Sequence, residues 1–279
     1  TRDGVVTEVP SDLRAEHRVE GELTYEHCFT RDGFDGPYSI FYHQRRPHTH
    51  TVAAVSGWQG PVAAPPRELA KRHYQTQTWA QTLAQPGAVA AGPFATGRVP
   101  LLFNNDVICG VGFPTAHDPH YLANGDGDEL IYVHRGGGVL RSLLGDVSFK
   151  QGDYVFVPRG LLHRWLPSID SGEAQHWLWF QLSGGLHVPR QWRNDVGQLR
   201  MDAPYCHRDF VRPEFVPPRD EGIRQLAVRQ GGRWHGFAYQ DSPLDVVGWD
   251  GTVYPWAFPI LNFQPRVSTV HLPPTWHGT

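Results

Sequence analysis

The most constraining feature of the chain is the run Gly152-Asp153-Tyr154-Val155-Phe156-Val157-Pro158-Arg159-Gly160-Leu161-Leu162-His163. It opens with a Gly-Asp turn, continues as an apolar strand and turns again at Pro158 and Gly160, which together favour a tight corner. The corner places His163 on the next strand, with its side chain facing inward. The run therefore predicts two consecutive strands with a histidine on their inner surface.

The stretch from Val99 to Leu182 consists of one short apolar strand after another, several of them joined by glycine turns. In its last segment, 174–182, tryptophans and glutamines share one face and the remaining residues the other, an alternation that marks a strand. Short strands at this spacing indicate a sandwich or jelly-roll barrel. Strands are expected at 38–42, 51–55, 99–103, 107–113, 129–134, 139–144, 147–149, 154–157, 163–166 and 174–182, and a helix at 67–81.

The composition supports an all-β fold and narrows the choice of partners. The 30 Gly and 24 Pro suit many turns between short strands. A net charge of −3 without a clustered basic face argues against nucleic-acid binding, and no apolar run is long enough to span a membrane. Cys28, Cys109 and Cys206 are far apart, so we expect free thiols in a cytoplasmic protein.

The run 152–163 resembles the second motif of the cupin family, G-x5-P-x-G-x2-H, with every spacing met. Glu129, followed after six residues by Gly136, resembles the end of the first cupin motif. That motif also has H-x-H about four residues before the glutamate, whereas here His120 precedes Glu129 by nine positions and 124–128 resembles an inserted loop.

Two interpretations of the barrel interior remain open at this point. The side chains His120, Glu129 and His163 form a 2-His-1-carboxylate set, which holds Fe(II) and leaves positions for substrate and O₂. Alternatively the barrel has lost its metal, and Glu129 and His163 are hydrogen-bonded barrel residues. The displaced histidine favours the second interpretation.

Further segments resemble the homogentisate 1,2-dioxygenase family, and their order matches as well. They are Gly36-Pro37-Tyr38-Ser39 with Tyr42-His43, Asn124-Gly125-Asp126-Gly127-Asp128-Glu129-Leu130, residues 152–165, and Asp245-Val246-Val247-Gly248-Trp249-Asp250-Gly251 followed by Tyr254-Pro255 and Asn262-Phe263. The resemblance extends from about residue 36 to the end of the chain.

The resemblance implies an oligomeric bicupin enzyme of tyrosine degradation. Such an enzyme uses non-haem Fe(II) and O₂ to open the ring of a small aromatic substrate, a hydroquinone acid. In that family the iron ligands lie in the second barrel, which would follow Thr279, and the first barrel is mainly structural. The family's active-site histidine, a base or hydrogen-bond partner of the substrate phenol, is best matched by His271.

The fold expected is therefore an all-β bicupin whose second barrel is incomplete in this sequence. We expect an N-terminal arm with short strands (1–98, irregular over 1–35), a first cupin barrel (99–185), a linker (186–224) and the start of a second barrel (225–279). The tryptophan-rich strand 174–182 is expected to be exposed, which would allow a homo-oligomer.

Two other classes of function compete with the ring-cleaving dioxygenase. One is a non-enzymatic, metal-free bicupin that binds or scaffolds. The other is a different cupin enzyme that works from the first barrel, such as a gentisate-type dioxygenase or a sugar isomerase. His271 and His277 lie beside Pro273-Pro274, and loops on a rigid barrel commonly carry function.

Overall fold

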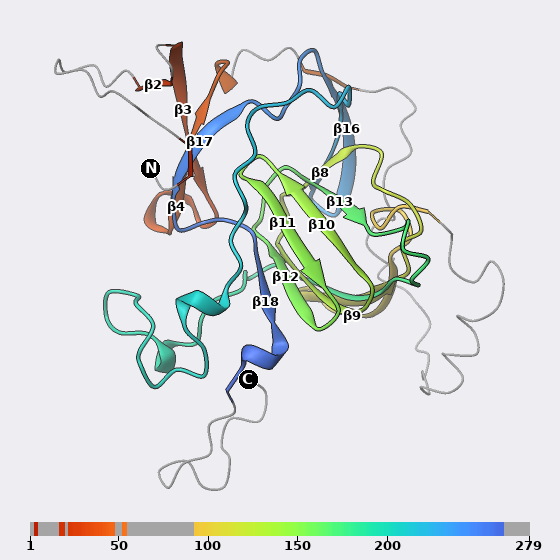
Figure 1. Ribbon diagram of the computed structural model, residues 1–279, viewed down its shortest axis with the longest axis vertical. Coiled ribbons are helices and arrows are strands. Elements are labelled where there is room, and N and C mark those ends of the chain that lie inside the picture. The colour runs from red at the N-terminus through yellow and green to blue at the C-terminus, as the bar shows by residue number, and fades with distance from the viewer. Residues whose placement is uncertain (1–2, 5–16, 20–21, 48–51, 55–91, 265–279) are drawn as a thin grey trace, which may run out of the picture.

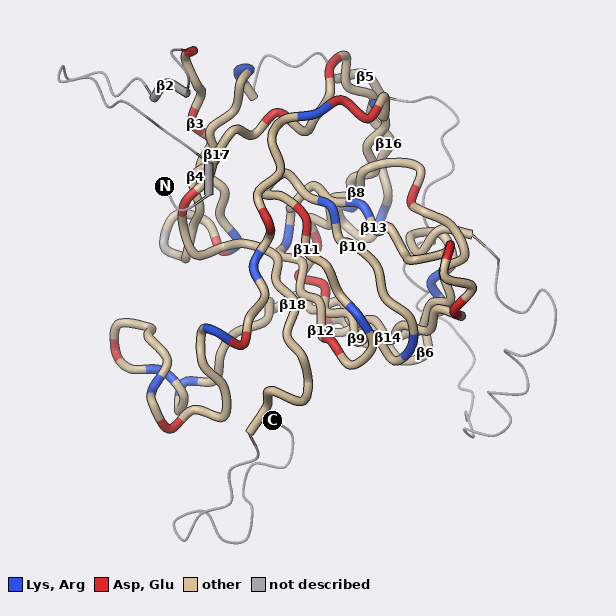
Figure 2. The backbone as a smooth tube through the Cα atoms, in the orientation of Figure 1, with Lys and Arg blue, Asp and Glu red and all other residues tan. Residues whose placement is uncertain are grey.

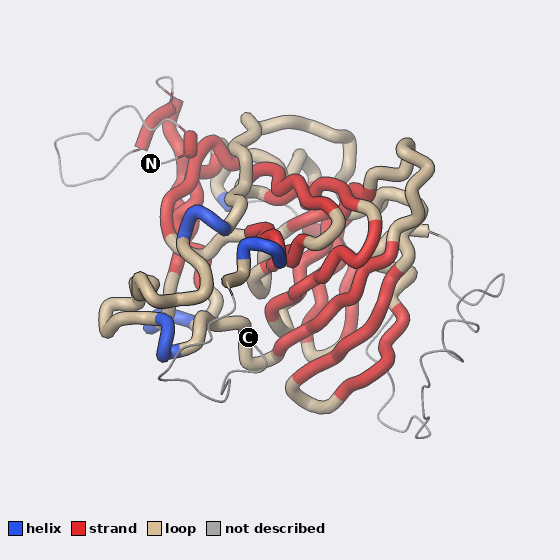
Figure 3. Tube along the Cα trace, turned by 60° about the horizontal axis from the view of Figure 1, so that its bottom comes forward, coloured by secondary structure: helices blue, strands red, loops and turns tan. Residues whose placement is uncertain are grey.

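A computed structural model describes residues 3–4, 17–19, 22–47, 52–54 and 92–264 of the 279-residue chain. The described strands form three sheets (Figure 1), and strands dominate the described residues, whose helices are short 3-10 turns (Figure 3). These turns are η1 (Gly33–Asp35), η3 (Arg190–Trp192), η4 (His207–Asp209) and η5 (Ile260–Asn262). None of the described helices is long and apolar enough to cross a membrane.

Two of the sheets face each other and form the jelly-roll barrel. The first has the order β18 (Trp256–Pro259), β12 (Asp153–Val157), β9 (Asp128–Arg135), β14 (His176–Leu182), β7 (Val107–Gly112) and β6 (Val99–Phe103). The second has the order β11 (Gly145–Lys150), β10 (Gly137–Ser142), β13 (His163–Pro167), β8 (Tyr121–Asn124), β15 (Gln225–Gln230), β16 (Arg233–Tyr239) and β5 (Val52–Ala54). The all-β cupin-type fold expected from the sequence is confirmed.

The third sheet lies beside the barrel and contains the N-terminal strands. Its order is β1 (Asp3–Gly4), β17 (Val246–Gly251), β4 (Tyr38–His43), β3 (Glu22–Thr30) and β2 (His17–Val19). Strand β17 comes from late in the chain and pairs with β4 through the register Trp249↔Phe41, so this sheet joins segments about 200 residues apart.

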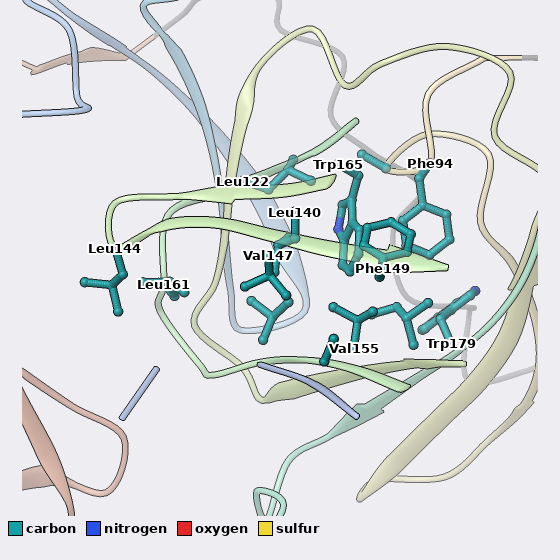
Figure 4. Packing of buried hydrophobic residues seen from close by; sticks show 14 of the residues in the cluster. Phe94, Leu122, Leu140, Leu144, Val147, Phe149, Val155, Leu161, Trp165 and Trp179 are labelled. Carbon is teal, nitrogen blue, oxygen red and sulfur yellow. The ribbon is translucent and has the colours of Figure 1, made fainter. Parts of the chain in front are cut away.

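The core between the barrel sheets is built around aromatic rings (Figure 4). Phe94 lies edge-on to Trp165 and Trp177, with ring centroids 5.5 and 4.9 Å apart, and Phe149 contacts the same two tryptophans at 5.7 and 5.3 Å. Both tryptophans are fully buried. Burial of such large rings contributes more to folding than burial of most other side chains.

The expectation that strand 174–182 exposes its tryptophans is wrong. Trp177 and Trp179 are 0% and 4% exposed. Strand β14 lies inside the first barrel sheet, between β9 and β7, and its tryptophan face points into the core. Alternation in sequence defines two faces of a strand, but the sheets packed around it decide which face is buried. This strand therefore gives no reason to expect an oligomer.

The expectation of an irregular segment over 1–35 is also wrong for part of that range. Residues 22–30 form the nine-residue strand β3, which pairs with β4 from Tyr25↔His43 to Thr30↔Tyr38. Leu23, Tyr25 and Phe29 lie on alternate positions, a pattern typical of a strand, although most β3 residues remain partly or fully exposed. The helix expected at 67–81 lies outside the described residues.

Strands between 225 and 259 extend the sheets already formed. Strand β15 pairs in parallel with β8 and antiparallel with β16, whereas β18 pairs with β12. The division of the chain at residue 225, with a second barrel beginning there, stays a prediction. Residues 186–224, expected as a linker, contain η3, η4 and isolated bridges, and extend partly away from the sheets (Figure 1).

Candidate metal centre of the barrel

The run that predicted an inward histidine has the expected geometry. Gly152 (φ 89°) and Gly160 (φ 80°) adopt left-handed conformations that glycine accepts readily, one on each side of β12. His163 begins β13, and its side chain is 1% exposed. Glu129 on β9 is equally buried, at 2% exposure. The two cupin motifs thus deliver a carboxylate and an imidazole to the barrel interior from opposite sheets.

Arg98 binds the carboxylate of Glu129 with both arms of its guanidinium. Nη1 donates to Oε1 and Nη2 donates to Oε2, each at 2.9 Å. The guanidinium also lies 4.5 Å from the ring centroid of Phe94 and 5.4 Å from that of Trp179. Paired and planar geometry of this kind is characteristic of strong arginine–carboxylate bonds. The charge on Glu129 is therefore neutralised by a neighbouring side chain.

The electrostatics of Glu129 follow from these contacts. Burial alone would raise the pKa of its carboxyl group, but the charge and hydrogen bonds of Arg98, helped by His163 and Asn124, outweigh burial and hold the pKa at about 2. Asn124 contributes by donating from Nδ2 to Oε1 at 2.8 Å. Glu129 is consequently ionised at any pH near neutrality.

A polar network continues from Asn124 towards the end of the barrel. The amide of Asn124 also donates to Gln181 Oε1 at 3.1 Å, and Arg229 donates to the same oxygen. Arg229 is held in turn by Asp126, with Nε and Oδ2 3.2 Å apart. Arg98, Gln181 and Arg229 were not predicted from the sequence as members of a site. Gln181 could have been predicted as a buried polar residue, because it shares one face of β14 with the tryptophans.

His163 is held as a neutral imidazole with one nitrogen facing the interior. Its Nδ1 donates to the carbonyl of Leu161 at 2.9 Å, and its Nε2 is buried without a hydrogen-bond partner among the described residues. Burial lowers the pKa of His163, against the opposing influence of Glu129. Metal-binding histidines commonly have this arrangement, with one nitrogen fixed on a carbonyl and the other left as a ligand.

The third residue of the predicted set does not join the other two. His120 is half-buried just before β8, where burial and the charge of Arg164 lower the pKa of its imidazole. Among the described residues, no group of three or more His, Cys, Asp or Glu side chains is arranged to hold a metal ion. The residues present therefore do not fit the Fe(II) site that His120, Glu129 and His163 would form, because Arg98 takes both oxygens of Glu129. His271 lies outside the described residues and its role stays a prediction.

A second buried polar cluster joins two segments that carried the family resemblance. His43 Nδ1 lies 2.7 Å from Asp245 Oδ1, and His27 Nδ1 lies 3.3 Å from His43 Nε2. His43 and Asp245 are both almost fully buried. Ser39 and Val253 make a further pair of hydrogen bonds between the same segments. The segments are 202 residues apart in the sequence at His43 and Asp245 and meet only in the folded structure.

Residues 112–260, more than half of the chain, match the family described as homogentisate 1,2-dioxygenase N-terminal. The chain belongs to this family. The match covers Glu129, His163 and Asp245, and it includes both the barrel run and the strand that pairs with the N-terminal sheet.

Curated relatives extend the similarity in both directions from this region. "Putative dioxygenase SSO1533" of Saccharolobus solfataricus is 28% identical over 274 residues, which are 98% of this chain and 67% of that protein. A homogentisate 1,2-dioxygenase of Nitrobacter hamburgensis is 29% identical over 149 residues, 53% of this chain and 31% of that protein. Another from Sinorhizobium medicae is 25% identical over 222 residues, 78% of this chain and 44% of that protein. This chain thus corresponds to about two thirds of the first relative and to less than half of the others.

Solved structures similar to this one include a cupin protein from Bacteroides fragilis. It is 16% identical, with a TM-score of 0.29, and covers 34% of this chain and 83% of that chain. A cupin-2 domain protein from Shewanella frigidimarina is 14% identical, with a TM-score of 0.27 over 30% of this chain and 78% of that chain.

Proposed function

We propose that this protein is a ring-cleaving dioxygenase of the homogentisate 1,2-dioxygenase type. It opens the ring of a hydroquinone acid with O₂ at a mononuclear Fe(II), and both oxygen atoms enter the product. Membership of the family over residues 112–260 carries the proposal. The Saccharolobus solfataricus relative, which matches 98% of the chain and bears a dioxygenase name, supports it.

In this proposal the barrel of residues 99–185 supports the enzyme and does not perform its chemistry. This part of the proposal is supported by Arg98, which binds both oxygens of Glu129 and so keeps the cupin-motif glutamate from an iron ion. By the family resemblance, we assign the iron to the second barrel, which would follow Thr279. His271 accepts the phenol proton of the substrate, a role that suits an imidazole titrating near pH ~6.5.

The family resemblance also supports a cellular location, a metabolic role and an oligomeric state for the enzyme. We assign the enzyme to the cytoplasm, to aromatic amino acid catabolism in the direction of tyrosine degradation, and to a homo-oligomer. Acidic and basic residues are interspersed along the described backbone (Figure 2), which suits a small-molecule substrate better than a polyanion.

Oxygen uptake by the full-length protein tests the activity. With Fe(II) added, we expect uptake with homogentisate that exceeds uptake with gentisate and with plain hydroquinone. His271→Gln is expected to lower the turnover number by about 100-fold, the lower end of what a positioned acid or base contributes. His235→Gln, at an exposed position on β16, is the matched control and should leave turnover unchanged.

Two results would contradict the proposal, and they distinguish the competing classes. Absence of oxygen uptake with all three compounds favours the non-enzymatic bicupin. Arg98 agrees with that class, because it binds Glu129 where a metal ion would otherwise bind. Uptake that is abolished by His163→Ala, with the fold intact by circular dichroism, favours a cupin enzyme that works from the first barrel.

A further inference from the structure

Arg98 stands at an unusual place for an arginine. It directly precedes edge strand β6, yet its guanidinium lies inside the barrel and its side chain is only 8% exposed. Desolvating a charged side chain to this degree costs free energy unless the charge is paired and hydrogen-bonded. Here the pairing group is Glu129, the residue that matches the glutamate of the first cupin motif.

We propose that the guanidinium of Arg98 is a built-in cation that occupies the metal position of this barrel. Glu129 and His163 reach the interior from facing sheets, and β8 connects them, because His163 pairs with Leu122 and Asn124 on the same strand donates to Glu129. Both oxygens of the Glu129 carboxylate bind Arg98 and are therefore not available to a metal ion. This inference goes beyond the ring-cleaving function proposed above and does not depend on it.

The unpaired nitrogen of His163 is the second observation that points to a cation site. A buried imidazole nitrogen without a partner costs free energy, and most buried polar atoms avoid that state. Because Nδ1–H is fixed on the carbonyl of Leu161, the lone pair of Nε2 remains available in the interior. A guanidinium satisfies Glu129 but leaves this lone pair unused, whereas a metal ion would use both groups.

Charge explains why arginine and metal exclude each other. A second buried arginine, Arg229, is held by Asp126 and is linked to Glu129 by hydrogen bonds through Gln181 and Asn124; its charge also acts on Glu129 and Arg98. A divalent ion added beside Arg98 would place three positive charges against the single negative charge of Glu129. Like charges in a dry interior repel strongly, since water screens them little there.

The proposal predicts the chemical class of ligand that the barrel accepts when Arg98 is shortened. Arg98→Ala leaves a carboxylate and an imidazole nitrogen facing a space the size of the lost guanidinium. One nitrogen and one carboxylate, completed by water or amide oxygens, suit a first-row divalent ion such as Co(II) or Zn(II). The wild-type barrel should take up neither.

Cobalt titration of the full-length protein tests this, with visible absorption and elemental analysis as readouts after chelator treatment and desalting. We expect Arg98→Ala to bind one more Co(II) per chain than the wild type, with new d–d absorption. The double variant Arg98→Ala/His163→Ala should lose that additional ion. Because the result is a difference between variants, cobalt bound elsewhere in the protein cancels.

Several outcomes would overturn the proposal. A wild-type protein that already binds a Co(II) removed by His163→Ala contradicts exclusion by Arg98. A folded Arg98→Ala that takes up no additional Co(II) shows that the position is an ordinary buried ion pair. If Arg98→Ala does not fold, Arg98→Gln, which retains part of the packing on Phe94 and Trp179, is judged by the same measurement. Oxygen uptake is a separate readout, so failure here leaves the proposed dioxygenase untouched.

Discussion

The half-buried His27 and the buried His43 and Asp245 form a chain of hydrogen-bonded polar groups. His43 Nδ1–H donates to Asp245 Oδ1, and a single hydrogen bond joins His43 Nε2 to His27 Nδ1. Only one proton fits between the two imidazoles. Burial, reinforced by the charge of His43 and opposed by that of Asp245, lowers the pKa of His27.

This arrangement predicts that His27 makes the protein sensitive to mild acid. A folded-state pKa below the unfolded value of ~6.5 means that the unfolded chain takes up the proton first. The stability it contributes is present above pH 6.5 and declines as the pH falls through the folded pKa. We therefore expect His27→Gln, which retains a donor for His43, to lose less free energy of unfolding than the wild type between pH 7 and pH 5.

Urea unfolding at both pH values measures this difference. His235→Gln serves as control, because His235 is exposed on β16 and should behave as the wild type does. A pH dependence of His27→Gln identical to that of the wild type would refute the assignment.

At the scale of elements, glycine sets how closely strands and rings approach in the first barrel sheet. A Cβ added to Gly110 on β7 would lie 2.3 Å from the carbonyl oxygen of Val99 and 2.8 Å from the ring of Trp179. The contacts come from two sides, from the neighbouring strand β6 and from the core. Neither the backbone of β6 nor the packed indole can move away without cost.

Gly110→Ala is accordingly expected to destabilise the protein by about 1–3 kcal/mol through overpacking. Gly184→Ala is the matched control, since its added Cβ meets nothing within 4 Å and its φ lies outside the left-handed region. Thermal or urea unfolding of the two variants is the measurement. Equal stabilities would show that the sheet adjusts at Gly110 without strain.

At the scale of the whole molecule, Glu221 ties the segment that follows the barrel back onto its second sheet. It accepts hydrogen bonds from Arg164 at 2.9 Å and from Tyr121 at 2.8 Å, and it is also bonded to Arg141. Arg219, two residues earlier, reaches Asp146 at 3.0 Å. These contacts cross between residues about 60–100 positions apart and fix residues 219–221 against β8, β10 and β13.

Removing this carboxylate should weaken the whole fold. Glu221→Gln is expected to lower the free energy of unfolding by about 2 kcal/mol, the range for hydrogen bonds to charged groups, since Arg164 is largely buried. Asp202→Asn removes a comparable but exposed pair with Arg200 and should leave the free energy of unfolding essentially unchanged. Similar effects for both variants, measured by urea unfolding, would contradict a stabilising role for Glu221.

Local signals in the sequence determined most of the barrel. The turns at Gly152 and Gly160 and the apolar alternation of β14 depend on neighbouring residues only, so all strands from 99 to 182 except β8, and the inward position of His163, were predicted correctly. Strand β8 escaped prediction because all four of its residues are buried and no alternation marks them. The same motifs predicted Glu129 as an inner residue.

Tertiary structure decided everything that depends on which surfaces meet. Arg98 and Glu129 are 31 residues apart in the sequence. Their spacing does not predict that an arginine before an edge strand places its side chain in the interior. The buried face of β14 was likewise set by its neighbours β9 and β7. A sequence specifies turns and strand faces through short-range sterics, whereas the pairing of charges follows from barrel closure, which brings distant residues into one low-dielectric space.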